Sequence, residues 1–191
     1  MIIITKIIKN IHRYLKSEKA NVFSVKYGCE NCGFEGKLHR HGFYSRNVIT
    51  KYQTNKISVL RVKCPSCDKT YSLLPPFVIP YYQYSFDLIF YCLYCYYVKK
   101  QTYKKIVNHL HNINPNNYIN ISNISFYCNR MRNISSVVNY FFVNYKDFYY
   151  KMNNSSIAAI VEKIKLFNDK YDNNFNHIYF EKMINYFFAD F

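Results

Sequence analysis

The sequence has few acidic residues, and this shortage makes the protein strongly basic. Eleven Asp and Glu oppose 26 Lys and Arg in 191 residues, which gives a formal charge of +15. A chain this basic is expected to bind polyanions, of which nucleic acid and anionic membrane surfaces are the commonest. Half of the residues are hydrophobic and a fifth are aromatic, far above the composition of disordered chains. We therefore expect a folded basic protein of one domain or two small ones.

Glycine is also scarce, and none occurs from residue 85 onward, where Pro115 is the only proline. Apolar residues recur there at helical spacing, which predicts helices over 85–98, 102–111, 122–150, 155–168 and 177–190. Earlier in the chain, three glycines cluster within 29–73, and residues 56–63 alternate between polar and apolar side chains as a β-strand does. The pattern predicts an α+β fold, in which a small β unit precedes a helical part.

Several signatures of other protein classes are missing. The sequence contains no glycine-rich phosphate loop with its lysine, no H-E-x-x-H motif and no nucleophile elbow. No secretory signal is visible, so we expect intracellular thiols and a cytoplasmic protein. The best candidate for a membrane span, residues 88–98, has about half of the ~20 residues that a spanning helix needs. We expect a buried helix there and no membrane partner.

Four of the seven cysteines form two C-x-x-C pairs, Cys29 with Cys32 and Cys64 with Cys67, with 31 residues between the pairs. The two-residue gap lets both thiolates of a tight turn converge on one ion. Glycine follows the first pair and aspartate the second, and both tolerate the left-handed conformation that such turns often need. The spacing predicts a closed, structural zinc site with four thiolate ligands, as in a zinc ribbon. Redox C-x-x-C motifs and adventitious iron are the alternatives.

Other cysteines and histidines are weaker candidates for metal ligands. His39 and His41 lie between the two pairs and could replace a thiolate, but contact with solvent or phosphate is the favoured interpretation. Cys92 and Cys95 lie in an aromatic stretch of predicted helix, so we expect them to pack in the core. A second metal site that joins them to Cys128 or His109 is the alternative.

The segment from 37 to 69 combines positive charge with aromatic rings. It holds eight Lys and Arg against one acidic residue, Asp68. Phosphate contacts and base stacking are both available to such a surface, which favours nucleic-acid binding. A solvated lysine face is the alternative. The predicted contact residues in this segment are Lys37, Arg40, His41, Arg46, Lys51, Arg61 and Lys63.

The predicted helices near 102–111 and 122–150 suggest a helix-turn-helix. Thr102 is a suitable N-cap for the first of them. Residues 122–133 form the expected recognition helix, because Asn and Arg side chains can pair with adenine and guanine edges in the major groove. Its predicted contact residues are Asn129, Arg130 and Arg132. Ordinary helix packing with a polar outer face is the alternative, since the joint of about nine residues exceeds the 3 to 4 of the tight turn.

The features Arg40-His-Gly-Phe-Tyr-Ser-Arg46, Arg61, Cys64-x-x-Cys67 and Lys69-Thr-Tyr-Ser-Leu-Leu-Pro75 lie within residues 27–142. Together they resemble the N-terminal zinc-ribbon and helix-turn-helix region of bacterial insertion-sequence transposases and related transposase-like proteins of unknown function. In such transposases this region binds the terminal DNA of the element, and a separate RNase H-like domain cuts and joins strands with three carboxylates on two metal ions. The acidic residues after Pro80 do not lie in the strand pattern of that domain. The resemblance therefore implies DNA binding and zinc, without strand transfer.

We expect four parts in the chain: an N-terminal amphipathic helix within 1–28, a zinc ribbon with a proline-rich connector over 29–84, a helix-turn-helix-like domain over 85–152 and C-terminal helices over 153–191. The predicted function is zinc-dependent DNA binding by a non-enzymatic, nucleoid-associated protein of a mobile element. Double-stranded DNA is the favoured partner, with single-stranded DNA, RNA and a homodimer left open. The alternatives are a divergent transposase or nuclease whose acidic residues converge only in three dimensions, and an interaction module that binds through Tyr179, Tyr186 and Phe187.

Overall fold

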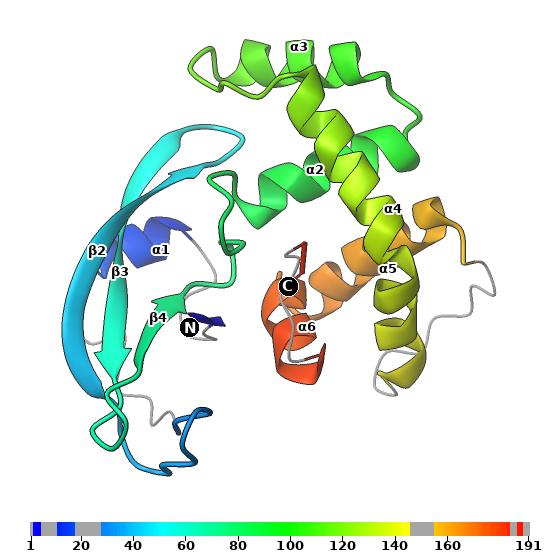
Figure 1. The fold of residues 1–191 in the computed structure, drawn as a ribbon. Coiled ribbons are helices and arrows are strands. Elements are labelled where there is room, and N and C mark those ends of the chain that lie inside the picture. Colours follow the sequence, from blue (N-terminus) through cyan, green and yellow to red (C-terminus); the bar gives the residue numbers. More distant parts are fainter. Residues whose placement is uncertain (1, 5–10, 18–27, 146–154, 184–186, 189–191) are drawn as a thin grey trace.

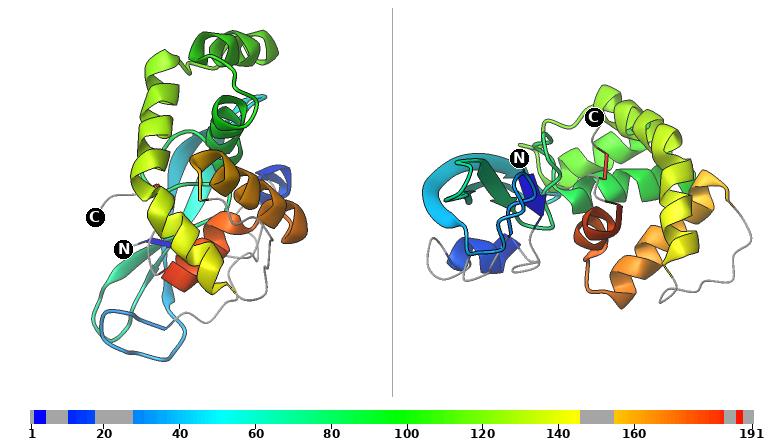
Figure 2. Two further views of the ribbon diagram at one scale, coloured as in Figure 1. Left: turned by 90° about the vertical axis from the view of Figure 1, so that its right-hand side faces the viewer. Right: turned by 60° about the horizontal axis from the view of Figure 1, so that its bottom comes forward.

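The computed structural model describes residues 2–4, 11–17, 28–145, 155–183 and 187–188. Over these residues the fold is α+β, as predicted, with one four-stranded sheet and six helices. Figure 1 shows the sheet as a curved ribbon beside the helices, and the second view in Figure 2 separates the two layers. The elements are β1 (Ile2–Ile4), α1 (Ile11–Lys16), β2 (His39–Ile49), β3 (Thr54–Lys63), β4 (Thr70–Leu74), α2 (Phe86–Tyr97), α3 (Tyr103–Ile113), α4 (Ile121–Asn144), α5 (Ile157–Lys170) and α6 (Phe175–Met183).

The sheet has the strand order β1-β4-β3-β2. Strands β2, β3 and β4 are consecutive and antiparallel, and β3 contains the predicted strand over 56–63. Alternate side chains of β3 fill two cores: Leu60 packs beneath the cysteine-bearing loops, and Val59 packs on the opposite face. A β-bulge between Arg40 and Gly42 shifts the register of β2, and Gly42 has a φ of 123° that favours glycine.

The N-terminal region contains a helix within the expected range 1–28, and also a strand that was not expected. In this region Ile11–Lys16 is helical, and Ile2–Ile4 forms β1, which pairs in parallel with β4. Three successive isoleucines suit a buried strand, because β-branched side chains favour the extended backbone. On α1, the ring of Tyr14 packs edge-on against Phe77, with ring centroids 5.6 Å apart, and its hydroxyl donates to the Ser58 carbonyl at 2.8 Å.

Helices α2 to α5 start within two residues of their predicted starts, and Thr102 is the N-cap that was predicted. Ser85, Thr102, Asn120 and Ser156 each accept a hydrogen bond from a backbone N–H of the first turn of α2, α3, α4 or α5. The expected helix over 122–150 corresponds to α4, which ends at Asn144, and residues 146–154 lie outside the described part. The last helix starts at Phe175 and runs to Met183, so it begins earlier than the expected 177–190. No helix in these described ranges is both long and apolar enough to span a bilayer.

Residues 75–84 join the sheet to α2, and two side chains hold them in place. Arg46 on β2 donates to the carbonyls of Ile79, at 2.8 Å, and Tyr82. Asn176 on α6 is fully buried, and its amide donates to the carbonyls of Pro76 and Val78 at 2.9 and 3.0 Å. The connector is therefore bonded to both layers, and it is buried from Pro75 to Pro80.

Candidate metal centre

Two short loops with matching backbone geometry carry the four cysteines. In the first, the N–H of Gly33 donates to the Cys29 carbonyl at 2.8 Å, and Gly33 has a φ of 72°. In the second, the N–H of Asp68 donates to the Cys64 carbonyl at 3.1 Å, and Asp68 has a φ of 59°. The predicted left-handed residue after each pair is thus confirmed. Glycine adopts this backbone freely and aspartate with little strain, so the sequence folds both loops in the same way.

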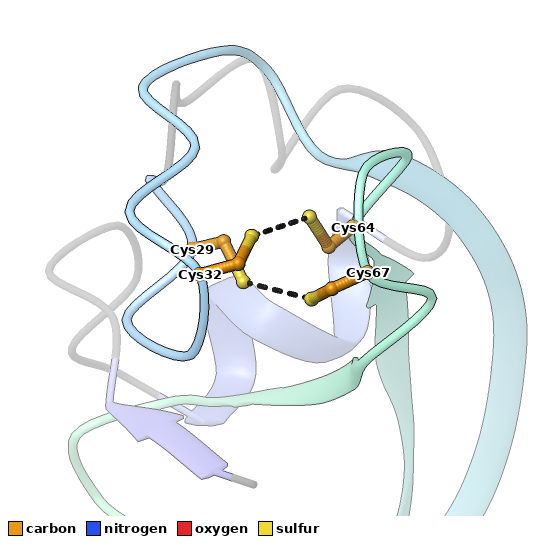
Figure 3. Close-up of side chains that lie close together, drawn as sticks. All are labelled: Cys29, Cys32, Cys64 and Cys67. Carbon is orange, nitrogen blue, oxygen red and sulfur yellow. Dashed lines mark hydrogen bonds between the residues drawn. The ribbon is translucent and has the colours of Figure 1, made fainter.

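The four thiol groups point toward one another from these two loops (Figure 3). The sulfur of Cys29 lies 3.5 Å from that of Cys67, and the sulfur of Cys32 lies 3.7 Å from that of Cys64. All four sulfurs lie within 4.8 Å of one another. A tetrahedron with metal–sulfur bonds of about 2.3 Å has sulfur–sulfur edges of about 3.8 Å, whereas a disulfide bond is about 2.05 Å long. The arrangement therefore fits four ligands around one metal ion and contains no bonded sulfur pair.

A buried tyrosine supports the site from the sheet. The hydroxyl of Tyr71 on β4 lies 3.0 Å from the sulfur of Cys29, and it accepts from the N–H of Asn31 at 3.3 Å. Burial raises the pKa of Tyr71, so its hydroxyl remains protonated and can donate to the thiolate. Burial also raises the pKa of the Cys29 thiol, but the hydrogen bonds from Tyr71 and from the N–H groups of Cys32 and Asn31 outweigh it, and the pKa is lowered to about 6. This places a thiolate at the centre near neutral pH.

The other cysteines and the histidines do not join this group. Among the described residues, the group that could hold a metal ion consists of the four cysteines, without His39 or His41. Cys92, Cys95 and Cys128 are buried in the helical core, as predicted, and burial raises the pKa of the Cys92 thiol. They are packed as neutral apolar groups.

Exposed basic side chains surround the cysteine end of the ribbon. Lys37, Arg40, His41 and Arg61 are exposed, and Arg61 pairs in register with Gly42 across the hairpin. Glu30 and Glu35 are also exposed on the first cysteine loop and offset part of this charge.

Three of the predicted contact residues on the ribbon have protein partners. Arg46 donates to the connector carbonyls and is partly buried, so its guanidinium holds the fold together, contrary to the expected phosphate contact. Lys63 forms an ion pair with Asp68 at 2.8 Å. The ammonium of Lys51 lies 4.1 Å from the ring centroid of Tyr91 on α2, which places it at the opposite end of the hairpin from the cysteines.

The expected recognition helix over 122–133 also needs correction. Asn129 and Arg132 are exposed on α4, but Arg130 is 8% exposed, and its Nε donates to the Phe188 carbonyl at 3.0 Å. A guanidinium used in this way joins α4 to the end of the chain and is not available to a base edge. The aromatic rings of the alternative interaction module are buried as well, with Tyr179 3% and Phe187 1% exposed, and Tyr186 lies outside the described residues.

Part of the chain matches a known family model. Residues 29–108 match a domain of unknown function, DUF6431. The match begins at Cys29 and extends through β2, β3, β4 and α2 into α3, so it includes all four cysteines. The searches of curated proteins and of solved structures gave no match.

Sequence reasoning missed the residue that supports the Cys29 ligand and the residue that holds the connector. Tyr71 lies within a predicted β unit, but nothing in the spacing singles out its hydroxyl as a partner of Cys29. A tyrosine four residues after a C-x-x-C pair is the one available signal, since it continues the strand that leaves the metal loop. Asn176 carries no local signal, because its partners are 98 and 100 residues away.

Proposed function

We propose that this chain is a zinc-dependent DNA-binding protein, transposase-like but without the transposase catalytic domain, that belongs to a mobile element and acts at the nucleoid. The observation that carries the proposal is the convergence of four thiol groups at the end of a ribbon with exposed basic side chains. The acid-poor sequence and the resemblance to transposase ribbons support it.

Zinc is the metal that this donor set suits best. Four thiolates are soft ligands, and a tetrahedral set of four leaves no open position for water or substrate, as in structural zinc sites. Cys29, Cys32, Cys64 and Cys67 would hold the ion, which would fix the two loops to each other and thereby the register of the strands behind them. In a β unit this small, metal binding is expected to supply on the order of 10 kcal/mol of folding free energy.

Double-stranded DNA is the proposed ligand of the basic surface. Lysine and arginine bind DNA by displacing counterions from its phosphates, a contribution that does not depend on base sequence. Exposed Lys37, Arg40 and Arg61 can make such contacts, and His41 can add a hydrogen bond. Exposed aromatic rings such as Phe43, at 36% exposed, leave single-stranded DNA or RNA as ligands to be compared with the duplex.

The test measures metal content and duplex binding on the same purified full-length protein. We expect one zinc ion per chain, and binding to a short DNA duplex that is lost after a strong chelator and restored by added zinc. With three phosphate contacts, raising the salt concentration from about 50 to about 200 mM should weaken binding about 40-fold. Zinc without any salt-sensitive binding to duplex, single strand or RNA would refute the DNA-binding function, and iron in place of zinc would refute the metal assignment.

Self-association is a second candidate property, and one feature favours it. The outer face of α4 exposes apolar side chains, including Phe126 at 52%, Tyr140 at 62% and Val143 at 72%. The helix carries no acidic residue and only two basic ones. Two chains of charge +15 repel each other over most of their surfaces, and an uncharged face is where a second copy could dock with the least repulsion.

A further inference from the structure

Helix α3 presents a face of polar and basic side chains to solvent, of which His109 also stacks on Tyr91. Its buried residues, Ile106, Val107 and Leu110, lie on one side against the helical core. The opposite side is exposed and consists of residues that donate hydrogen bonds or carry positive charge. These exposed residues are Lys104, Lys105, Asn108, His109 and Asn112.

The charge around α3 has one sign. The sequence contains no Asp or Glu between Asp87 and Asp147, a stretch that includes all of α3 and α4. Lys99 and Lys100 are exposed directly before α3, so four lysines fall within seven residues of the sequence. A field of this kind attracts a polyanion and carries no carboxylate to repel it.

The tip of the β2–β3 hairpin is coupled to this helix through a stack of side chains. The ammonium of Lys51 lies over the ring of Tyr91, and the same ring stacks on His109 with centroids 6.0 Å apart. Tyr52, next in the hairpin turn, is 70% exposed. In Figure 1 the hairpin turn lies at the same end of the molecule as α2 and α3, whereas the cysteine loops lie at the far end of the ribbon. The hairpin tip and α3 therefore offer basic groups at the same end of the molecule.

Helix α4 is placed differently. It packs against α2, α3, α5 and α6, and its Arg130 is committed to the Phe188 carbonyl. Its exposed face is dominated by apolar side chains and Asn, with Arg132 at its edge. Helix α4 therefore lies at the centre of the helical part, and the shorter α3 packs against it.

We infer that α3, and not the N-terminal half of α4, is the helix that contacts DNA. This inference rests on the proposed function and assigns the helical part of its binding surface. Lys104 and Lys105 contact phosphates, while Asn108 and Asn112, one turn apart, face base edges in the major groove, where an asparagine amide can pair with adenine. Lys51 and Tyr52 extend the contact onto the hairpin.

The affinity test compares two double variants of the full chain, each of which removes two positive charges. Lys104→Gln/Lys105→Gln alters α3, and Lys170→Gln/Lys182→Gln alters exposed lysines on α5 and α6. On a short mixed-sequence duplex, the α3 variant should lose affinity and its slope of log affinity against log salt should become shallower by about 1.8 units, the value for two lost phosphate contacts. The control variant should keep the wild-type slope.

The specificity test uses selection from a random-sequence duplex library. Asn108→Ala/Asn112→Ala should change the selected sequences, and Asn129→Ala/Asn133→Ala on the exposed face of α4 should leave them unchanged. The opposite result, or equal salt slopes for the two lysine variants, would overturn the assignment to α3 while wild-type binding upheld the proposed function. If the wild-type chain bound neither duplex, single strand nor RNA, the assignment to α3 and the proposed function would both be refuted. Circular dichroism confirms that every variant is folded.

Discussion

The hydroxyl of Tyr71 should set the strength of metal binding, and the substitution Tyr71→Phe isolates it. The ring is fully buried between the cysteine loops and the sheet, and phenylalanine keeps that packing. The variant loses the donor that lies 3.0 Å from the Cys29 sulfur and the acceptor of the Asn31 N–H. Partners of metal ligands are typically worth 10- to 100-fold in affinity, so we expect zinc affinity to fall by that factor, about 1.4–2.7 kcal/mol.

The loss should also appear in the pH dependence. Hydrogen bonding holds the pKa of Cys29 at about 6, below its ordinary value of 9.0. Because the pKa of Cys29 is depressed, its ionisation adds fully to the stability of the folded state at pH values above the ordinary pKa. This contribution is lost as the pH falls toward 6. Without the tyrosine hydroxyl the pKa rises, because one of the hydrogen bonds that lower it is gone. Zinc should therefore leave the variant at a higher pH than it leaves the wild type.

Competition with a chromophoric chelator measures both the zinc affinity and its pH dependence. The variant Tyr14→Phe is the matched control. The Tyr14 hydroxyl is also bonded, to the Ser58 carbonyl at 2.8 Å, but it lies on the other face of the sheet with no cysteine beside it. The control should lose about 1 kcal/mol of stability and keep its zinc affinity. Unchanged affinity in Tyr71→Phe, or an equal fall in both variants, would refute the reasoning.

Two further predictions concern the helical part. Asn176→Ala leaves the Pro76 and Val78 carbonyls without their donor, so the midpoint of urea unfolding should fall by an amount equivalent to about 1–3 kcal/mol, whereas Asn129→Ala on an exposed position should leave it unchanged. An unshifted midpoint would mean that the connector is not held by this side chain. If α4 mediates a dimer, the double variant Tyr140→Glu/Val143→Glu should be a monomer, and light scattering measures this. A wild-type chain that is monomeric at high concentration would exclude that interface.

The metal centre could be predicted from the sequence because its determinants are local. Each C-x-x-C loop closes through hydrogen bonds within six residues, and the left-handed positions of Gly33 and Asp68 follow from residue type. The capped starts of the helices were predictable for the same reason. Ser85 and Thr102 accept hydrogen bonds from residues three positions ahead.

The roles of the arginines could not be predicted in this way. Arg46 and Arg130 both bind backbone carbonyls, 33 or more residues away, and a carbonyl is present at every position. A backbone carbonyl cannot be recognised from the type of residue that carries it. From the sequence alone, both arginines therefore resembled ordinary surface cations. Strand β1 poses the same problem, because its pairing with Ser72–Leu74 is a long-range contact that the three isoleucines do not specify.

The contact between Asn176 and the connector joins residues that are made far apart in time during synthesis. A chain emerges from the ribosome with its N-terminus first, so all four cysteines are available about a hundred residues before α6 has been made. We expect the nascent ribbon to take up its metal while the Pro76 and Val78 carbonyls still face water. We expect the amide of Asn176 to bind these carbonyls only after α6 has been made, when the cysteine loops have already folded.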